Sequence, residues 1–217
     1  MSVHVLSQSL AHVLLTRLRN YSTDRREFTE ALHQLSLMLT IKATEHVTTF
    51  KKQVETPLET ISGTFFCDKT ALVPIMRAGS GMLPAFQLFI PESLVWHVSM
   101  SRDETTLQPK FKSSNIPTSM DEQDESGSPL IDTAFVLDPM LATGGSAHLA
   151  IQMLEKSTFV NKIIFVGILG APEGVERLEN EHPNVDIILA GLDRELNEHG
   201  YILPGLGNAG DRLFPTR

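Results

Sequence analysis

The chain has 217 residues, of which 41% are hydrophobic, and a formal net charge of −8. A chain of this length folds most often as one domain and buries roughly 70% of its unfolded surface. It has neither an apolar stretch near the ~20 residues of a membrane helix nor the basic-then-apolar start of a signal peptide. The acidic balance argues against nucleic-acid binding, which needs clustered Lys and Arg. With a single cysteine, Cys67, these features predict a soluble, cytoplasmic protein forming one domain over residues 1–217.

The first element predicted after residue 22 is a helix. Asp24 and Glu27 have the spacing of a capping box, and apolar residues at positions 28, 32, 35 and 39 fall on one face. From residue 71 onward, predicted strands and helices alternate, which favours an α/β fold with a mostly parallel twisted sheet flanked by helices. The expected strands are 71–76, 94–100, 133–137, 162–169 and 185–190, and the expected helices are 81–89, 146–156 and 172–181.

The segment 112–129 interrupts this alternation. It is rich in Ser, Asp, Glu, Pro and Gly and has few apolar residues to anchor it. This composition predicts a mobile loop or a flexible hairpin within residues 101–132. A disordered insertion without a catalytic role remains the alternative for residues 113–128.

A phosphate site is predicted where the strand 133–137 runs through a turn of small residues into the next helix. The free N–H groups and the positive dipole end of that helix converge on one point, and Thr143 and Ser146 can add hydroxyl donors. A nucleotide-hydrolysing P-loop is excluded because it requires a lysine before its terminal Ser or Thr, where this chain has Gly145. Asp138 can instead accept hydrogen bonds from a pair of sugar hydroxyls, which indicates a phosphorylated ribose as ligand.

The order acid, hydrophobic residues, then Ala-Thr-Gly-Gly resembles the ribose-phosphate signature of the type I phosphoribosyltransferases. The version in residues 138–146, Asp-Pro-Met-Leu-Ala-Thr-Gly-Gly-Ser, resembles that of the uracil phosphoribosyltransferases, because most of the superfamily has a second acid at Pro139. Segments 74–79, 101–109 and 200–212 agree with the same family. The resemblance covers nearly the whole chain.

The resemblance implies transfer of the 5-phosphoribosyl group from 5-phosphoribosyl 1-diphosphate (PRPP) to uracil, which gives UMP and diphosphate in pyrimidine salvage. It further implies Mg²⁺ held mainly by PRPP without a direct protein ligand, and a homodimer or larger homo-oligomer. Control by GTP, found in part of the family, is left open. The implied catalytic residues are Arg102 and Asp138. The implied PRPP-binding residues are Arg77, Arg102, Asp138, Pro139, Met140, Leu141, Ala142, Thr143, Gly144, Gly145, Ser146 and Asn208. The implied uracil-binding residues, in a hood over residues 191–217, are Ile202, Gly207, Asn208 and Ala209.

The carboxyl-terminal glycines also satisfy a second pattern, the G-x-G-x-x-G of dinucleotide-binding proteins. That fingerprint requires a following helix and an acid about twenty residues later, and only residues 211–217 remain here. Two positions depart from many family members, namely Ser101, where tyrosine is common, and Asn208, where aspartate is common. They keep open a regulator or an inactive subunit with this fold, and a transferase for another base is a further alternative. None of the eight histidines is assigned as a general base.

Overall fold

The computed structural model describes residues 2–102, 109–117, 130–157 and 159–216, with the side chain of Arg102 excepted. Its main feature is a sheet of nine strands in the order β1-β11-β10-β8-β4-β6-β7, with β5 beside β4 and β9 beside β10. All described pairings in this sheet are parallel except that of β6 with β7. The strands are β1 (Val3–Val5), β4 (Thr70–Met76), β5 (Leu94–Val95), β6 (Val98–Arg102), β7 (Pro109–Ser114), β8 (Ile131–Leu137), β9 (Met140–Leu141), β10 (Val160–Gly170) and β11 (Asp186–Leu192).

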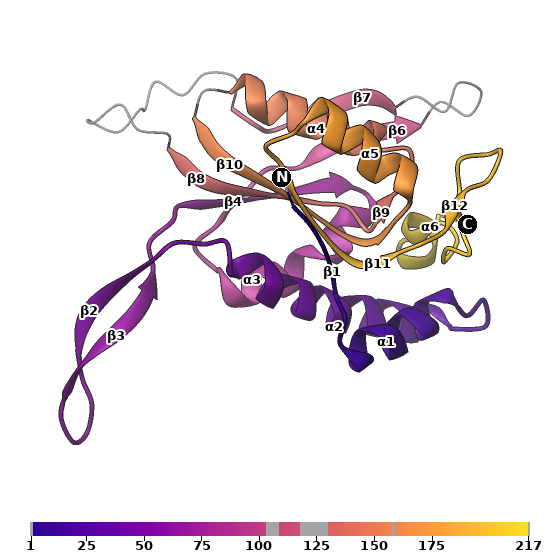
Figure 1. Cartoon of the computed structure of the whole chain (residues 1–217). Helices are drawn as coiled ribbons and strands as arrows, with labels where there is room; N and C mark the ends of the chain where they lie inside the picture. Colours follow the sequence, from indigo (N-terminus) through magenta and orange to yellow (C-terminus); the bar gives the residue numbers. More distant parts are fainter. Residues whose placement is uncertain (1, 103–108, 118–129, 158, 217) are drawn as a thin grey trace.

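Helices cover both faces of the sheet (Figure 1). On one face lie α1 (Ser9–Arg19), α2 (Arg25–Thr44) and α3 (Leu83–Phe89), and on the other lie α4 (Gly145–Lys156) and α5 (Pro172–Glu181). A short α6 (Ala209–Leu213) lies near the carboxyl terminus. The helices α1 and α2 share an apolar core with one face of the sheet, and α4 and α5 share a second core with the other face. The fold class expected from the alternation of strands and helices is therefore confirmed.

The central strand β8 shows why the sheet lies between two layers. Phe135 and Leu137 belong to the core beneath α1 and α2, whereas Ala134 and Val136 belong to the core beneath α4. Successive side chains of a strand point to opposite faces, so a strand that is apolar at every position must be covered on both sides. This burial fixes the end of β8, and with it the position of the residues that follow.

A two-stranded arm projects away from the sheet (Figure 1). It consists of β2 (Thr49–Glu55) and β3 (Thr60–Phe66), which pair antiparallel. Most of its residues are exposed, including the aromatic rings of Phe50, Phe65 and Phe66. An isolated hairpin is marginally stable in water, so an arm of this kind gains from a surface to pack against.

The structure confirms the helix expected near residue 24, which is α2. The Asp24 side chain caps it by accepting a hydrogen bond from the Glu27 N–H at 2.8 Å. The expectation for residues 112–129 is partly corrected, because residues 112–114 belong to β7, which pairs with β6. Residues 103–108 and 118–129, where most of the expected flexible hairpin falls, lie outside the described residues. Among the helices that are described, none is long and apolar enough to cross a membrane.

Candidate active site

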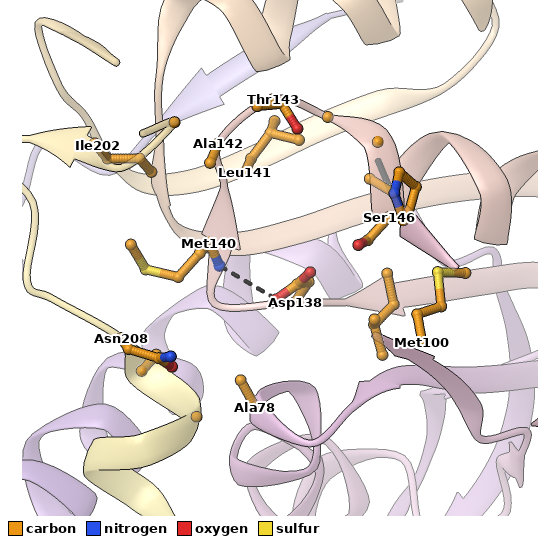
Figure 2. Close-up of a pocket in the computed structure, with 18 of the residues that line it drawn as sticks. Ala78, Met100, Asp138, Met140, Leu141, Ala142, Thr143, Ser146, Ile202 and Asn208 are labelled. Carbon is orange, nitrogen blue, oxygen red and sulfur yellow. Dashed lines mark hydrogen bonds between the residues drawn. The ribbon is translucent and has the colours of Figure 1, made fainter. Parts of the chain in front are cut away.

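One pocket, of about 430 Å³, lies beyond the carboxyl ends of the central strands. Its walls come from three separate parts of the chain: the end of β4 with the turn after it, residues 138–147, and residues 200–210. Figure 2 shows Asp138 in the middle of this pocket, with Ser146 and Met100 to one side of it and Ile202 and Asn208 to the other. Ligands of parallel α/β sheets bind at this edge, as the sequence predicted.

The phosphate loop, residues 138–146, joins β8 to α4 without a gap. Gly144 caps α4 with φ of 73°, a left-handed conformation that favours glycine. A Cβ atom on Gly144 would also lie 3.1 Å from the Gly174 carbonyl oxygen. Within the described part of the chain, the hydroxyls of Thr143 and Ser146 have no protein hydrogen-bond partner. The loop therefore presents backbone N–H groups and two hydroxyls to an anion in the pocket.

Asp138 is held at the start of this loop. Its backbone N–H donates to the Val166 carbonyl at 3.2 Å, and its carboxylate accepts from the Met140 N–H at 3.3 Å. Burial raises the pKa of Asp138 to about 7, because the single hydrogen bond from Met140 only partly offsets the loss of solvent. A carboxyl group poised near neutral pH can gain its charge when donors, such as sugar hydroxyls, arrive.

Arg77 lies at the opposite wall, where β4 ends and the peptide bond from Met76 is cis. Its guanidinium donates to the Asp211 carboxylate at 2.8 Å and to the Phe214 carbonyl at 3.0 Å. The turn after it approaches β8 closely, since a Cβ on Gly79 would lie only 2.2 Å from the Leu137 carbonyl oxygen. Arg77 thus borders the pocket while it holds the carboxyl-terminal segment against the sheet.

The hood is fastened to α1 by two arginines. Arg19 pairs with Asp193 through two nitrogens, at 2.7 Å and 2.5 Å, and Asp193 also accepts from the Gly205 N–H at 2.8 Å. Arg212 stacks over the Phe28 ring at 4.1 Å and donates to four backbone carbonyls. Those carbonyls belong to Leu18, Leu206, Asn20 and Thr23. Polar contacts between distant segments therefore set the position of this wall.

Asn208 begins the short helix α6 within the hood. Its side-chain oxygen caps the helix by accepting from the Asp211 N–H at 3.2 Å. Asparagine and aspartate are both good residues at this position. The structure therefore gives Asn208 a local role that either side chain could fill, beside its place at the pocket wall.

The structure brings together in one pocket nearly all the residues predicted for the site. Two exceptions stand out: Pro139 does not line the pocket, because it follows Asp138 on the buried side of the loop, and the side chain of Arg102 lies outside the described residues. The predicted residues that line the pocket are Arg77, Asp138, Met140, Leu141, Ala142, Thr143, Gly144, Gly145, Ser146, Ile202, Gly207, Asn208 and Ala209.

Several pocket residues were not predicted as site residues. Met100 and Ser101, at the end of β6, and Gly200 and Tyr201, beside Ile202, also line it. Their signal in the sequence was their position, since each lies next to a predicted site residue at the same edge of the sheet. Ser101, noted only as a departure from other family members, is thus part of the pocket wall.

Solved structures with this architecture define the class. An adenine phosphoribosyl transferase of Trypanosoma brucei, solved with AMP, pyrophosphate and ribose-5-phosphate, superimposes with a TM-score of 0.52 at 11% identity, covering 88% of this chain and 83% of the other. At that identity the likeness concerns the fold alone. A protein of Aquifex aeolicus superimposes with a TM-score of 0.87 at 29% identity, covering 99% of this chain and 98% of the other. The fold is that of a type I phosphoribosyltransferase.

Sequence comparison narrows the class to one family. The family model for uracil phosphoribosyltransferase matches residues 5–216. A uracil phosphoribosyltransferase of Roseiflexus castenholzii is 42% identical, with 99% of this chain and 98% of the relative covered. One of Dictyoglomus turgidum is 43% identical, with 99% of this chain and all of the relative covered. The chain belongs to the uracil phosphoribosyltransferase family.

Proposed function

We propose that this chain transfers the 5-phosphoribosyl group of PRPP to uracil in the pocket described above, releasing UMP and diphosphate. The observation that carries the proposal is the convergence of the phosphate loop, Asp138, Arg77 and the hood around one cavity. The two substrates need different surroundings, an anion site and a flat polar surface for the base. The pocket has one of each on opposite sides.

On the phosphate side, the N–H groups of residues 142–146 and the hydroxyls of Thr143 and Ser146 would hold the 5′-phosphate. Asp138 would accept hydrogen bonds from the ribose hydroxyls, which anchors the sugar at both ends. Negative charge grows on the diphosphate as it leaves C1 of the sugar, and the planar guanidinium of Arg77 can make two parallel hydrogen bonds to it. Family resemblance assigns the same task to Arg102.

The pocket fits a magnesium ion that is carried by the substrate. Asp138 is the one carboxylate among the described residues that line it, and Mg²⁺ prefers several oxygen ligands. Protein oxygens are therefore too few to hold the ion alone, whereas the diphosphate of PRPP supplies more. When bound, Mg²⁺ neutralises charge on the leaving diphosphate.

On the base side, the hood would orient uracil. Uracil has alternating carbonyl acceptors and N–H donors, which backbone N–H and C=O groups of residues 207–209 can match in a fixed geometry. Ile202, which is 4% exposed, contributes apolar surface beside them. Held in this way, the uracil nitrogen faces the anomeric carbon, so positioning supplies a large part of the catalysis.

We further propose that the enzyme is a cytoplasmic homodimer or larger homo-oligomer in which the arm packs against a second copy. The arm has no core of its own, and it exposes apolar side chains on both strands, among them Phe50, Ile61, Phe65 and Phe66. Replacing Phe65 by Ser is expected to shift the oligomer toward monomer in sedimentation experiments. An unchanged mass would contradict the role of the arm.

Measuring release of diphosphate from PRPP and Mg²⁺ with different bases tests the proposed activity. Uracil, cytosine, orotate, hypoxanthine and no base are compared, and UMP is identified as product. Release with uracil alone supports the proposal. Release with another base would overturn the assignment of the hood, and PRPP binding without release for any base would indicate a regulator or an inactive subunit.

A further inference from the structure

A cluster of histidine and glutamate side chains lies where α4 meets the end of α5, outside the pocket. His148 comes from α4, and Glu181 and His182 come from the end of α5. One ligand atom from each of the three lies within 4.8 Å of the others. His148 Nδ1 is 2.9 Å from His182 Nε2 and 2.5 Å from a Glu181 carboxylate oxygen. Two packed elements thus point three electron-rich atoms at one place.

The hydrogen bonds around His182 determine which of its nitrogens carries the proton. Its Nδ1 is 2.9 Å from a carboxylate oxygen of Glu155, and because an ionised carboxylate only accepts, Nδ1 donates. The neutral ring then has a lone pair at Nε2, directed at His148. The one proton on His148 Nδ1 is left to serve both Nε2 and the Glu181 oxygen. Three lone-pair atoms therefore surround the position of a single proton, and a metal ion could take its place.

Charge and exposure around the cluster also suit a cation. Glu155 and Glu181 bring two negative charges, and the positive charge of Arg177, 3.1 Å from Glu181, offsets only one of them. The His182 side chain is 2% exposed, which fixes its ring, whereas that of Glu181 is 39% exposed. Water can therefore reach the cluster from the side of Glu181.

We infer that His148, His182 and Glu181 form a binding site for a divalent cation of the zinc type, with water as the fourth ligand. Two imidazoles and one carboxylate are a common ligand set for zinc, and they do not suit Mg²⁺, which prefers oxygen. At ligand distances of about 2.0–2.1 Å, tetrahedral ligands lie about 3.3 Å apart, so the side chains need to separate by less than about 1 Å. Glu155 would be a positioning residue that orients His182, as carboxylates do behind metal-bound histidines.

Such an ion would lie directly behind the phosphate loop. His148 donates its backbone N–H to the Gly144 carbonyl at 2.8 Å, in the first turn of α4. Arg177 contacts both Glu181 and, at 3.5 Å, the Thr143 carbonyl. An ion would therefore link α4 to the end of α5 at the base of the loop. This inference does not depend on the proposed transferase activity.

Titration calorimetry with zinc chloride on the untagged, chelator-treated full chain, without PRPP, tests the site. We expect one Zn²⁺ per chain and a rise in Tm of a few degrees, because an ion that binds only the folded state stabilises it. Magnesium chloride is expected to bind no such site. Cobalt chloride gives a second readout, namely the visible absorption of tetrahedral Co²⁺.

Variants decide whether the ion binds at this cluster. His148→Gln and the more exposed Glu181→Gln are each expected to abolish the stoichiometric heat and the Co²⁺ absorption, and Glu155→Gln to weaken zinc binding about 10- to 100-fold. His46→Gln is the matched control. His46 is also partly buried and faces a carboxylate, Asp186 at 3.6 Å, but there the Lys162 ammonium is 3.2 Å from the ring nitrogen. Absence of stoichiometric zinc binding, or unchanged binding in both His148→Gln and Glu181→Gln, would overturn the inference.

Discussion

The two sides of the pocket are built in different ways. The phosphate side is one continuous stretch, residues 138–146, fixed between the buried strand β8 and the helix α4. The base side is a segment with little regular structure, held by contacts such as that of Arg19 with Asp193, which are 174 residues apart. Stability of the first side comes from the sheet itself, and stability of the second comes from a few polar contacts.

This difference predicts how each side responds to change. A side supported by the apolar core should lose function only when a residue in contact with substrate is altered. A side supported by ion pairs should also lose function when a distant anchor is removed. Arg77 touches both sides, since it lines the pocket and pairs with Asp211 of the hood.

Arg77→Ala should therefore have the largest effect. We expect kcat to fall on the order of 10²–10³-fold, the usual result of removing one preorganised donor for developing charge. Arg77→Lys is the matched variant, because lysine keeps the charge but loses the two parallel hydrogen bonds to phosphate. Steady-state rates with saturating PRPP and uracil measure both. A rate for Arg77→Ala close to that of the unmodified chain would remove Arg77 from the mechanism.

Arg19→Met tests the base side alone. The side chain of Asp193 is 5% exposed, and loss of its partner leaves an unpaired buried charge, which costs about 3 kcal/mol in the free energy of unfolding. We expect the KM for uracil to rise about tenfold or more, with a smaller change in the affinity for PRPP. Arg17→Met, an exposed neighbour on the same helix, should change stability by less than about 0.5 kcal/mol. Equal losses for both substrates would contradict the separation of the two sides.

The pH dependence of PRPP binding tests the phosphate side. Because the pKa of Asp138 is raised to about 7, PRPP affinity should fall by up to about tenfold per pH unit below 7, where the carboxyl group is protonated. Calorimetry from pH 5.5 to pH 8.5 measures it. Asp138→Asn is the reference, since protonation of the substrate phosphates affects both proteins equally. Identical pH profiles for the two proteins would show that Asp138 does not titrate in this range.

The same group makes a prediction about stability, with the opposite sign to that of a paired carboxylate. The folded-state pKa lies above the ordinary value of 3.8, so the folded protein binds more protons than the unfolded chain between about pH 4 and 7. Stability therefore falls as the pH rises through this window. Asp138→Asn should be more stable than the unmodified chain at pH 8 while it binds PRPP more weakly, as measured by urea unfolding.

The sequence predicted the phosphate side well because its residues are neighbours in the chain. Strand, acid, small-residue turn and helix follow one another in residues 133–156, so local patterns were enough. The anchors of the hood could not be predicted in this way, since nothing local pairs Arg19 with Asp193. The cluster of His148 with His182 was missed for the same reason, because it forms only when α5 packs beside α4.

Two elements were missed for different reasons. The helix α1 was readable, since Ala11, Leu14, Leu15 and Leu18 have helical spacing and are all buried. The arm was not readable, because both of its faces are exposed and its strands carry no alternation of apolar and polar residues. A pattern forms in the sequence only where one face of an element is buried by the rest of the same chain.

The smallest expected effect concerns Asn208, where the two sides of the pocket meet. Its side chain caps α6 through the Asp211 N–H, and aspartate caps equally well, so Asn208→Asp should leave stability within about 0.5 kcal/mol of the unmodified chain. The added carboxylate would face the ribose diphosphate and its Mg²⁺. We expect a change of a few fold in the dependence of rate on Mg²⁺ and PRPP, with no change in the choice of base. Asn208→Ala separates the cap from the charge, because it removes the cap at a cost of about 1 kcal/mol and adds no carboxylate. If Asn208→Asp left the Mg²⁺ and PRPP dependence unchanged, this residue would belong to the structure of the hood alone, and the boundary between the two sides would lie nearer to Arg77.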